Sequence, residues 1–309
     1  MRPPIASVLI SIVIGATLPS CSLIFSAGDN SGNSDTGDAG DAEGDARVVD
    51  ADAQSAVDAG TPDANMSACG LRANAVGWWR GDGDTTDSSA NPHSTSSSNF
   101  DSYNTGVFGQ AFSFGNGEVI VTIPDPTEDF LPGGSFSAEL WVFLNSTPTA
   151  GSAPAVLISK NEWAGIVPTN SAVSSWWVLA VGPRGKLQFW LKNSKTPQGG
   201  QVYAGKTMLV GDQFYHVVVQ RNTDSESVSL YVDGRLDMEF DNIGSELNSP
   251  LQNLDGEHDP LTIGGAERII PILNPTEFSG RIDEVAYYNY ALTPVQIDTL
   301  FNNGCVISQ

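Results

Sequence analysis

Four carboxylate or amide side chains lie close together in the stretch VGWWRGDGDTTDSSANPHS, residues 76–94. They belong to Asp82, Asp84, Asp87 and Asn91, and glycines between them leave the backbone flexible. Calcium takes about six to eight oxygen ligands from carboxylates, amide side chains and the carbonyls of flexible backbone. The stretch is therefore predicted to be a calcium loop, and a solvated acidic turn is the alternative.

A second stretch whose residues could bind a ligand is the predicted hairpin SSWWVLAVGPRGKLQFWLKN, residues 174–193. If Pro183–Arg184 is a two-residue turn, Trp177 faces Trp190, and Gln188 and Lys186 share that mixed face. The opposite face is wholly apolar and is expected to form core, because the two faces of a strand separate with period two. Its residues are Trp176, Val178, Ala180, Leu187, Phe189 and Leu191.

Sugars stack on flat rings while neighbouring polar groups bind their hydroxyls, and ligand sites combine apolar walls with a few polar groups. Trp177, Trp190, Gln188 and Lys186 are therefore predicted to bind a ligand. Two more aromatic residues from flanking segments, Trp163 and Tyr203, complete the predicted site. Alternatively, the rings pack beneath the loop at 161–175, and a one-residue slip of the turn changes the pairing.

The segments around these residues are predicted to be β-strands. Short runs rich in Val, Ile, Phe, Tyr and Trp recur after residue 68, bounded by Gly, Pro, Asn and Asp. Only LTPVQIDTLFNNG, residues 292–304, has helical signals, with Thr293 as the cap and Pro294 in the first turn. The fold class is predicted to be all-β, a two-sheet antiparallel jelly-roll sandwich with one short C-terminal helix. Trp78, Trp79 and Trp141 are predicted to lie in its core.

The first 20 residues have the composition of a secretory signal peptide, with Arg2 followed by a short apolar run. The sequence LPSC at 18–21 resembles the bacterial lipoprotein box, which implies a lipid on Cys21. Residues 21–67 are rich in Asp, Ala, Gly and Ser, with ten acidic residues and Arg47 alone between 27 and 67. Such a segment buries too little apolar surface to fold, so we expect a disordered tether before a domain at 68–309.

Charge and cysteine content limit the partners and the compartment. With 36 acidic and 14 basic residues the formal net charge is −22, which disfavours nucleic acid, because its phosphates need Lys and Arg. Membrane contact is expected through the lipid anchor only. Three cysteines leave Cys69 and Cys305 once Cys21 carries lipid, and an exported protein keeps such a pair oxidised. A disulfide between them is predicted, with two unpaired thiols as the alternative.

The order of motifs between Cys69 and Cys305 resembles the laminin-G-like branch of the concanavalin A-like lectin/glucanase superfamily. The motifs that carry this resemblance include GQAFSFGNGEVIVTIP, FSAELWVF, GDQFYHVVVQRN, VSLYVDGRL, LTIGG and FSGRIDEVAYYNYALTPVQI. The resemblance implies a curved sandwich that often holds a structural calcium. The resemblance implies that Asp87 and Asp283 bind this calcium, with Asp82, Asn91 and the carbonyl of His93 as further ligands.

The resemblance does not extend to catalysis. Glucanases of the superfamily place their acids as Glu-x-Asp-x-x-Glu on one strand, and no segment has this pattern. Asp283 and Glu284 are adjacent and are expected on opposite faces of a strand. Asp237, Glu239 and Asp241 would share one face, but their spacing of two and two differs from the glucanase motif. The protein is therefore predicted not to be an enzyme.

The predicted function is a monomeric, non-catalytic module that binds a carbohydrate or glycoconjugate, carried by an exported lipoprotein of the bacterial outer membrane or cell surface. The first alternative is a module that binds a cell-envelope protein or has a structural role without a sugar ligand. A glycoside hydrolase that lacks the usual motif is the third possibility.

Overall fold

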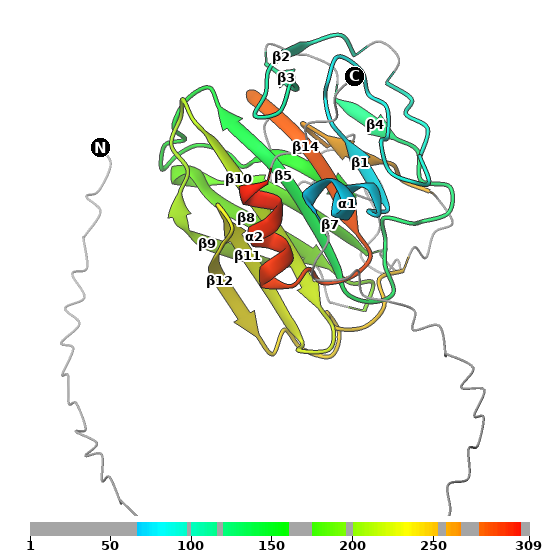
Figure 1. Ribbon diagram of the computed structural model, residues 1–309. Helices are drawn as coiled ribbons and strands as arrows, with labels where there is room; N and C mark the ends of the chain where they lie inside the picture. Colours follow the sequence, from blue (N-terminus) through cyan, green and yellow to red (C-terminus); the bar gives the residue numbers. More distant parts are fainter. Residues whose placement is uncertain are drawn as a thin grey trace, which may run out of the picture. The chain divides into compact units, whose positions relative to one another are not determined.

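Two antiparallel β-sheets make up most of the described chain in the computed structural model (Figure 1). The chain divides into two units, residues 1–56 and 57–309, and every described residue belongs to the second. The structure describes residues 67–97, 100–115, 120–160, 175–195, 200–252, 258–266 and 278–303. The predicted signal peptide, the tether up to residue 66, Cys21, Trp163 and Cys305 lie outside these residues.

The first sheet has eight strands, and its three central strands are the longest. The path through the sheet is β12 (Arg235–Asp241), β11 (Ser227–Val232), β10 (Phe214–Asn222), β5 (Phe136–Leu144), β14 (Gly280–Tyr288), β3 (Gln110–Phe114) and β2 (Tyr103–Thr105). The short strand β1 (Gly77–Trp79) pairs with β14 off this path.

The second sheet has six strands and packs its inner face against the first. Its order is β4 (Val121–Ile123), β13 (Leu261–Ile263), β6 (Ala155–Lys160), β7 (Trp176–Val181), β8 (Lys186–Lys192) and β9 (Gln201–Met208). Every pairing in both sheets is antiparallel. The predicted all-β antiparallel sandwich is confirmed.

Two helices lie on the outer face of the first sheet (Figure 1). The predicted C-terminal helix is α2 (Pro294–Asn302), and its Thr293 cap and Gln296 form a reciprocal capping box. The other, α1 (Ala68–Ala73), begins at the Ser67 cap and was not predicted, because six residues are too few to show helical periodicity. Neither described helix is long and apolar enough to cross a membrane.

The core between the sheets is built around a stack of aromatic rings. Trp177 on β7 stacks on Tyr287 of β14, with ring centroids 5.6 Å apart and planes 11° apart, and Phe136 of β5 packs against both. The Trp177 indole Nε1 donates to the Phe130 carbonyl at 2.9 Å, so this ring is buried with its polar atom satisfied. Trp79 belongs to the same core, as the sequence predicts.

The hairpin between β7 and β8 differs from its predicted register by one residue. The turn contains three residues, Pro183–Gly185 (η1), and Val181 pairs with Leu187 instead of Lys186. Gly185 has a φ of 71°, and a Cβ there would collide with the carbonyl of Leu209, so glycine is required at this position. The predicted two-residue turn is therefore wrong, and the face of β7 that enters the core is the one carrying Trp177.

Candidate functional site

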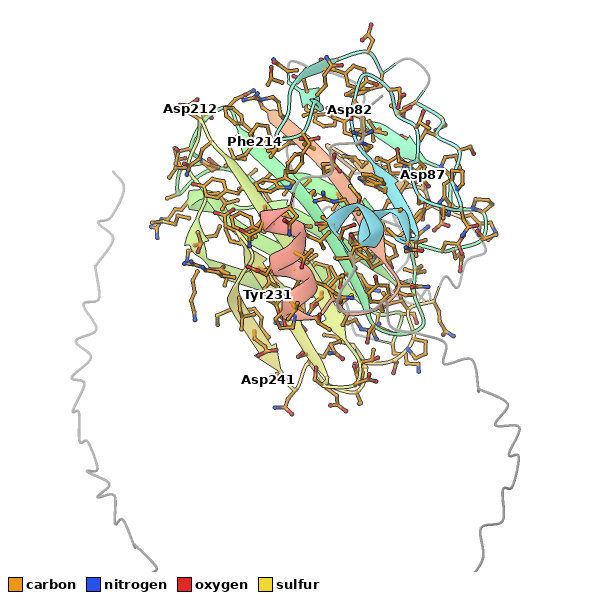
Figure 2. The ribbon with its side chains drawn as sticks, in the orientation of Figure 1. Asp82, Asp87, Asp212, Phe214, Tyr231 and Asp241 are labelled. Atoms are coloured by element: carbon orange, nitrogen blue, oxygen red, sulfur yellow. The ribbon has the colours of Figure 1, made fainter. Side chains whose placement is uncertain are left out.

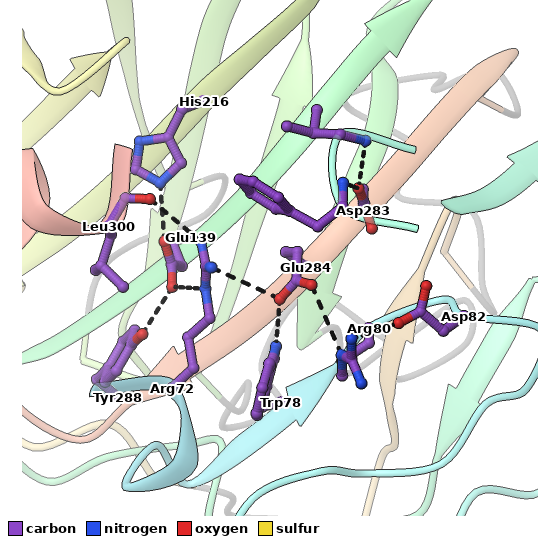
Figure 3. A network of polar contacts seen from close by, with 12 residues as sticks. Arg72, Trp78, Arg80, Asp82, Glu139, His216, Asp283, Glu284, Tyr288 and Leu300 are labelled. Atoms are coloured by element: carbon purple, nitrogen blue, oxygen red, sulfur yellow. Dashed lines mark hydrogen bonds and ion pairs between the residues drawn. The ribbon is translucent and has the colours of Figure 1, made fainter. Parts of the chain in front are cut away.

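A network of buried polar side chains lies between the outer face of the first sheet and its two helices (Figure 3). The Arg72 guanidinium on α1 donates from Nε to Glu139 on β5 at 3.1 Å and from Nη2 to the Leu300 carbonyl on α2 at 3.4 Å. Both charged side chains are fully buried. One guanidinium therefore joins the first helix, a central strand and the last helix.

Glu139 is the centre of this network. Tyr288 donates its hydroxyl to Oε1 at 2.7 Å, and His216 Nε2 lies 2.8 Å from Oε2. Burial alone would raise the pKa of Glu139, but Arg72, His216 and Tyr288 outweigh it and lower the pKa to about 2. Glu139 is therefore ionised in the folded protein at neutral pH, with its charge fully engaged inside the structure.

A β-bulge in β14 places Asp283 and Glu284 on the same side of the sheet. Asp283 pairs with Trp141 and Ala286 with Glu139, so two residues of β14 oppose one residue of β5, and Glu284 has a φ of 53°. Both carboxyl groups lie in the outer polar network (Figure 3). The expectation that these neighbours point to opposite faces is therefore wrong, because it assumed unbroken alternation.

The two carboxyl groups occupy a buried site with few counter-charges. Asp283 Oδ2 accepts the amides of Val107 and Phe108 at 2.7 and 3.1 Å, and its Oδ1 is buried without a partner among the described residues. Burial raises the pKa of Asp283 to about 8, and the charges of Glu284 and Asp82 add to that rise. Burial likewise raises the pKa of Glu284 to about 7, although Arg72 opposes it. Asp283 is therefore largely protonated at neutral pH.

The carboxylate of Asp87 is occupied by hydrogen-bond donors. Its Oδ1 accepts the amides of Trp78 and Ser89, each at 2.9 Å, and its Oδ2 accepts the amide of His93 at 2.7 Å. The His93 ring Nδ1 lies 3.0 Å from the same Oδ2. Asp87 thus anchors the loop after β1 through protein donors, and calcium ligation by Asp87 stays a prediction.

Of the other four predicted calcium ligands, His93 contacts Asp87, whereas Asp82 and Asn91 do not. Asp82 lies at a separate place in the loop (Figure 2), where it pairs with Arg80 at 2.6 Å and accepts the Gln110 amide at 2.8 Å. Asn91 is exposed. No group of three or more His, Cys, Asp or Glu side chains suited to a metal occurs within the described ranges. The predicted five-residue set is not assembled, and calcium at Asp283 stays a prediction.

The three-residue turn divides the predicted sugar-binding residues between two faces of the second sheet. Lys186, Gln188 and Trp190 lie together on the outer face, as predicted. Trp177 lies on the inner face, fully buried, and Tyr203 of β9 packs inward against Phe189. The predicted Trp177–Trp190 pair is therefore wrong, and Tyr203 belongs to the core, while Trp163 lies outside the described residues.

Sequence reasoning missed the outer-face partner of Trp190. Val178 is its cross-strand neighbour on β7, and Trp176 lies one pair further along the same face. The signal for this register was the glycine after Pro183–Arg184, since three-residue hairpin loops place glycine at the left-handed position.

The outer face offers unpaired polar atoms beside an aromatic floor. Trp190 is 9% exposed, and neither its Nε1 nor the Oε1 of Gln188 has a partner among the described residues. On β9, Gln188 faces exposed Ala204 and Trp190 faces half-buried Val202, so the residues across from this pair are small. We call the outer-face residues Trp176, Lys186, Gln188 and Trp190 the shelf. A donor and an acceptor two residues apart on one strand can bind neighbouring hydroxyl groups.

The acidic run on β12 does not form a row of carboxylates. Leu230 pairs with Met238 and Tyr231 with Leu236, so Asp237 is an extra residue without an opposite partner. Its carboxylate accepts the Lys206 and Thr207 amides of β9, and Glu239 accepts the Ser229 hydroxyl on β11. The prediction that Asp237, Glu239 and Asp241 share one face is wrong for Asp237 because this bulge interrupts the alternation, whereas Glu239 and Asp241 oppose Ser229 and Ser227 in regular register.

A family model described as the concanavalin A-like lectin/glucanases superfamily matches residues 115–298, more than half of the chain. The chain belongs to the concanavalin A-like lectin/glucanase superfamily. The matched range contains both sheets of the sandwich except β1, β2 and β3. Among curated proteins, no significant sequence match is found.

Solved structures with this superfamily's fold share little sequence with the chain. Domain 4 of AbnA, an extracellular arabinanase from Geobacillus stearothermophilus in complex with arabinotriose, is 18% identical, with a TM-score of 0.49 over 74% of this chain and 98% of that one. The binding domain of Paraclostridial Mosquitocidal Protein 1 is 14% identical, with a TM-score of 0.54 over 75% and 52%. Botulinum neurotoxin type C, whose cell entry depends on two ganglioside molecules, is 14% identical, with a TM-score of 0.50 over 75% and 52%. The chain spans about half the length of the latter two.

The structure describes one of the two cysteines of the predicted disulfide. Cys69, at the start of α1, is disulfide-bonded. The predicted partner Cys305 lies outside the described residues. The pairing of Cys69 with Cys305 therefore stays a prediction for this member of the superfamily.

Asp87→Ala is expected to lower the free energy of unfolding by about 2–3 kcal/mol, because three backbone amides lose a charged acceptor. The loss should be the same in calcium and in chelator, as measured by urea denaturation. Asp101→Ala, at an exposed position outside this loop, is the control and should change stability by less than about 0.5 kcal/mol. A calcium-dependent rise in melting temperature that Asp87→Ala abolishes would instead support the calcium prediction.

Asp283→Asn is expected to make stability less dependent on pH. The folded pKa of about 8 lies above the unfolded value, so the folded state binds more protons and wild-type stability falls as pH rises from about 4 to 8. Asparagine keeps an acceptor for both amides and stays neutral, so the variant should exceed the wild type by about 1 kcal/mol or more at about pH 8.

Urea denaturation across this pH range, in the presence of a chelator, measures the effect. Asp224→Asn, at an exposed turn, serves as the control and should keep the wild-type slope. Equal slopes for wild type and Asp283→Asn would mean that Asp283 is ionised in the folded state.

Proposed function

We propose that the domain is a non-catalytic carbohydrate-binding module. The observation that carries the proposal is the outer shelf of the second sheet, where the unpaired Trp190 Nε1 and Gln188 Oε1 flank an aromatic floor. A buried polar atom without a partner costs about 1–3 kcal/mol, and a hydroxyl-bearing ligand would recover this cost. Membership of a superfamily named for lectins and glucanases makes carbohydrate the first ligand class to test.

The arrangement of carboxylates supports a binding role over hydrolysis. A retaining glycosidase needs two carboxyl groups about 5 Å apart facing one bond. Asp237 is held by β9, and Glu239 is engaged with Ser229. Two of the solved proteins above are named with saccharide ligands, but the likeness to them concerns the fold alone.

We further propose that the module is displayed on the bacterial surface, in the outer membrane, by a lipid on Cys21 and a flexible acidic tether. The support is the sequence: an apolar signal ends at LPSC, and the segment before residue 68 is poor in apolar side chains. The tether would let a monomeric module reach a glycan away from the membrane.

A glycan array probed with the labelled full chain tests the binding proposal. Signal on at least one glycan is expected, and both Gln188→Ala and Trp190→Phe should reduce it about tenfold, since each removes one hydrogen-bonding group. Trp190→Phe keeps an aromatic floor, and Gln110→Ala alters an exposed glutamine on β3 of the first sheet as the matched control.

Undiminished signal in both variants would contradict the proposed shelf. A blank array, together with cross-linking of the wild type to one cell-envelope protein, would favour the protein-interaction alternative. Release of reducing sugar from a β-glucan that Glu239→Gln abolishes would favour a hydrolase.

Metabolic labelling with palmitate tests the anchor. The wild-type chain, expressed with its own N-terminus in a bacterium, should incorporate the label and sediment with outer membranes. Cys21→Ser should lose the label, because serine has no thiol to acylate, and should appear in the soluble fraction. Labelling of the serine variant, or an unlabelled wild type, would refute lipidation at Cys21.

A further inference from the structure

A pocket of about 430 Å³ opens where the turn between β11 and β12 meets β9 and α2. Its volume lies within the range of roughly 300–1,000 Å³ that is usual for small-molecule sites. The chemically distinctive lining residues are Thr207, Asp233, Arg235, Leu236, Asp237 and Phe301. None of them belongs to the shelf at Trp190, and no sequence pattern connects them, because they come from three separate elements.

The polar wall of the pocket is held in place by hydrogen bonds within the protein. Asp237 Oδ2 accepts the Lys206 amide at 2.8 Å, and its Oδ1 accepts the amide and hydroxyl of Thr207 at 3.0 and 2.7 Å. On the opposite side, Asp233 Oδ1 accepts the His216 amide at 2.9 Å. The two carboxylates are therefore preorganised, which lowers the entropic cost of binding a ligand.

The turn that forms the rim is fixed by its own chemistry. Asp233 and Gly234 have φ values of 50° and 74°, the conformation of a tight hairpin turn. A Cβ at Gly234 would approach the Phe301 ring to 3.0 Å, so the absence of a side chain lets the turn lie close to α2. Phe301 is in turn stacked on Trp141, at 5.7 Å between ring centroids.

After these contacts within the protein, three residues of the pocket can still contact a ligand. Asp233 uses one of about four acceptor positions of its carboxylate. Arg235 is exposed and makes no ion pair with any described residue, so its donors are available. Leu236 is 52% exposed and supplies an apolar surface next to Phe301.

These groups suit a ligand that has many hydroxyls and apolar C–H faces. Hydroxyl groups can donate to Asp233 and accept from Arg235, while C–H faces can pack on Leu236 and Phe301. Two carboxylates against one guanidinium leave the lining negative, and the whole chain has a net charge of −22, so an acidic ligand is disfavoured. We propose that this pocket binds a short neutral saccharide, as a second site distinct from the shelf.

The proposal rests on the proposed carbohydrate-binding function, and NMR and calorimetry on the full chain separate the two. The probes are cellotriose, xylotriose and maltotriose, with sialyllactose as the acidic counterpart. At least one neutral trisaccharide should shift the amide signals of residues 206–207 and 233–237. Arg235→Ala should weaken that binding about tenfold or more, whereas Trp190→Phe and Arg184→Ala, an exposed arginine in another turn, should not.

Each outcome supports or overturns a defined part of the proposal. Shifts confined to residues 186–190 would overturn the pocket and leave the proposed function standing. Tighter binding of sialyllactose than of the neutral sugars at 233–237 would overturn the neutral class. An absence of shifts at both places, together with a blank glycan array, would remove the pocket and the proposed function together.

Discussion

The buried Arg72–Glu139 pair is the interaction on which the docking of both described helices depends. It lies beneath α1 and α2, and it connects them to the central strands β5 and β14. Buried ion pairs are costly to desolvate, and loss of one partner typically costs about 3–5 kcal/mol because the other charge stays buried. Here Tyr288 and His216 complete the coordination of the carboxylate. The network therefore specifies where the helices dock, in addition to the apolar contacts of Leu71, Ile297 and Leu300.

Three departures from regular strand geometry decide which polar groups meet. A three-residue turn moves Trp177 into the core and leaves Trp190 on the outer shelf. A bulge at Glu284 turns it to the same side as Asp283, and another at Asp237 directs a carboxylate to β9. The turn adds one residue to a hairpin loop and each bulge adds one residue to a strand, and one residue is enough to reverse the facing of a side chain.

The two proposed binding surfaces differ in how the fold prepares them. The shelf at Trp190 belongs to a flat sheet face, where an aromatic ring and unpaired polar atoms are fixed by strand pairing. The pocket at Arg235 lies where the edge strands of the two sheets meet, and Asp237 joins these edges by accepting amides from β9. The polar atoms of the shelf come from one strand, whereas the pocket combines residues of β9, β12 and α2.

The fold class could be predicted from the sequence alone, because alternating apolar residues between turn signals leave few ways to bury both faces of many strands. The Thr293–Pro294 start likewise predicted the C-terminal helix, and the apolar pattern predicted the buried positions of Trp78 and Trp79. The register of the β7–β8 hairpin, the contacts of Asp87 and the pocket at Arg235 became visible in the three-dimensional structure. These depend on single inserted residues and on contacts between elements far apart in the chain, and local periodicity carries no information about either.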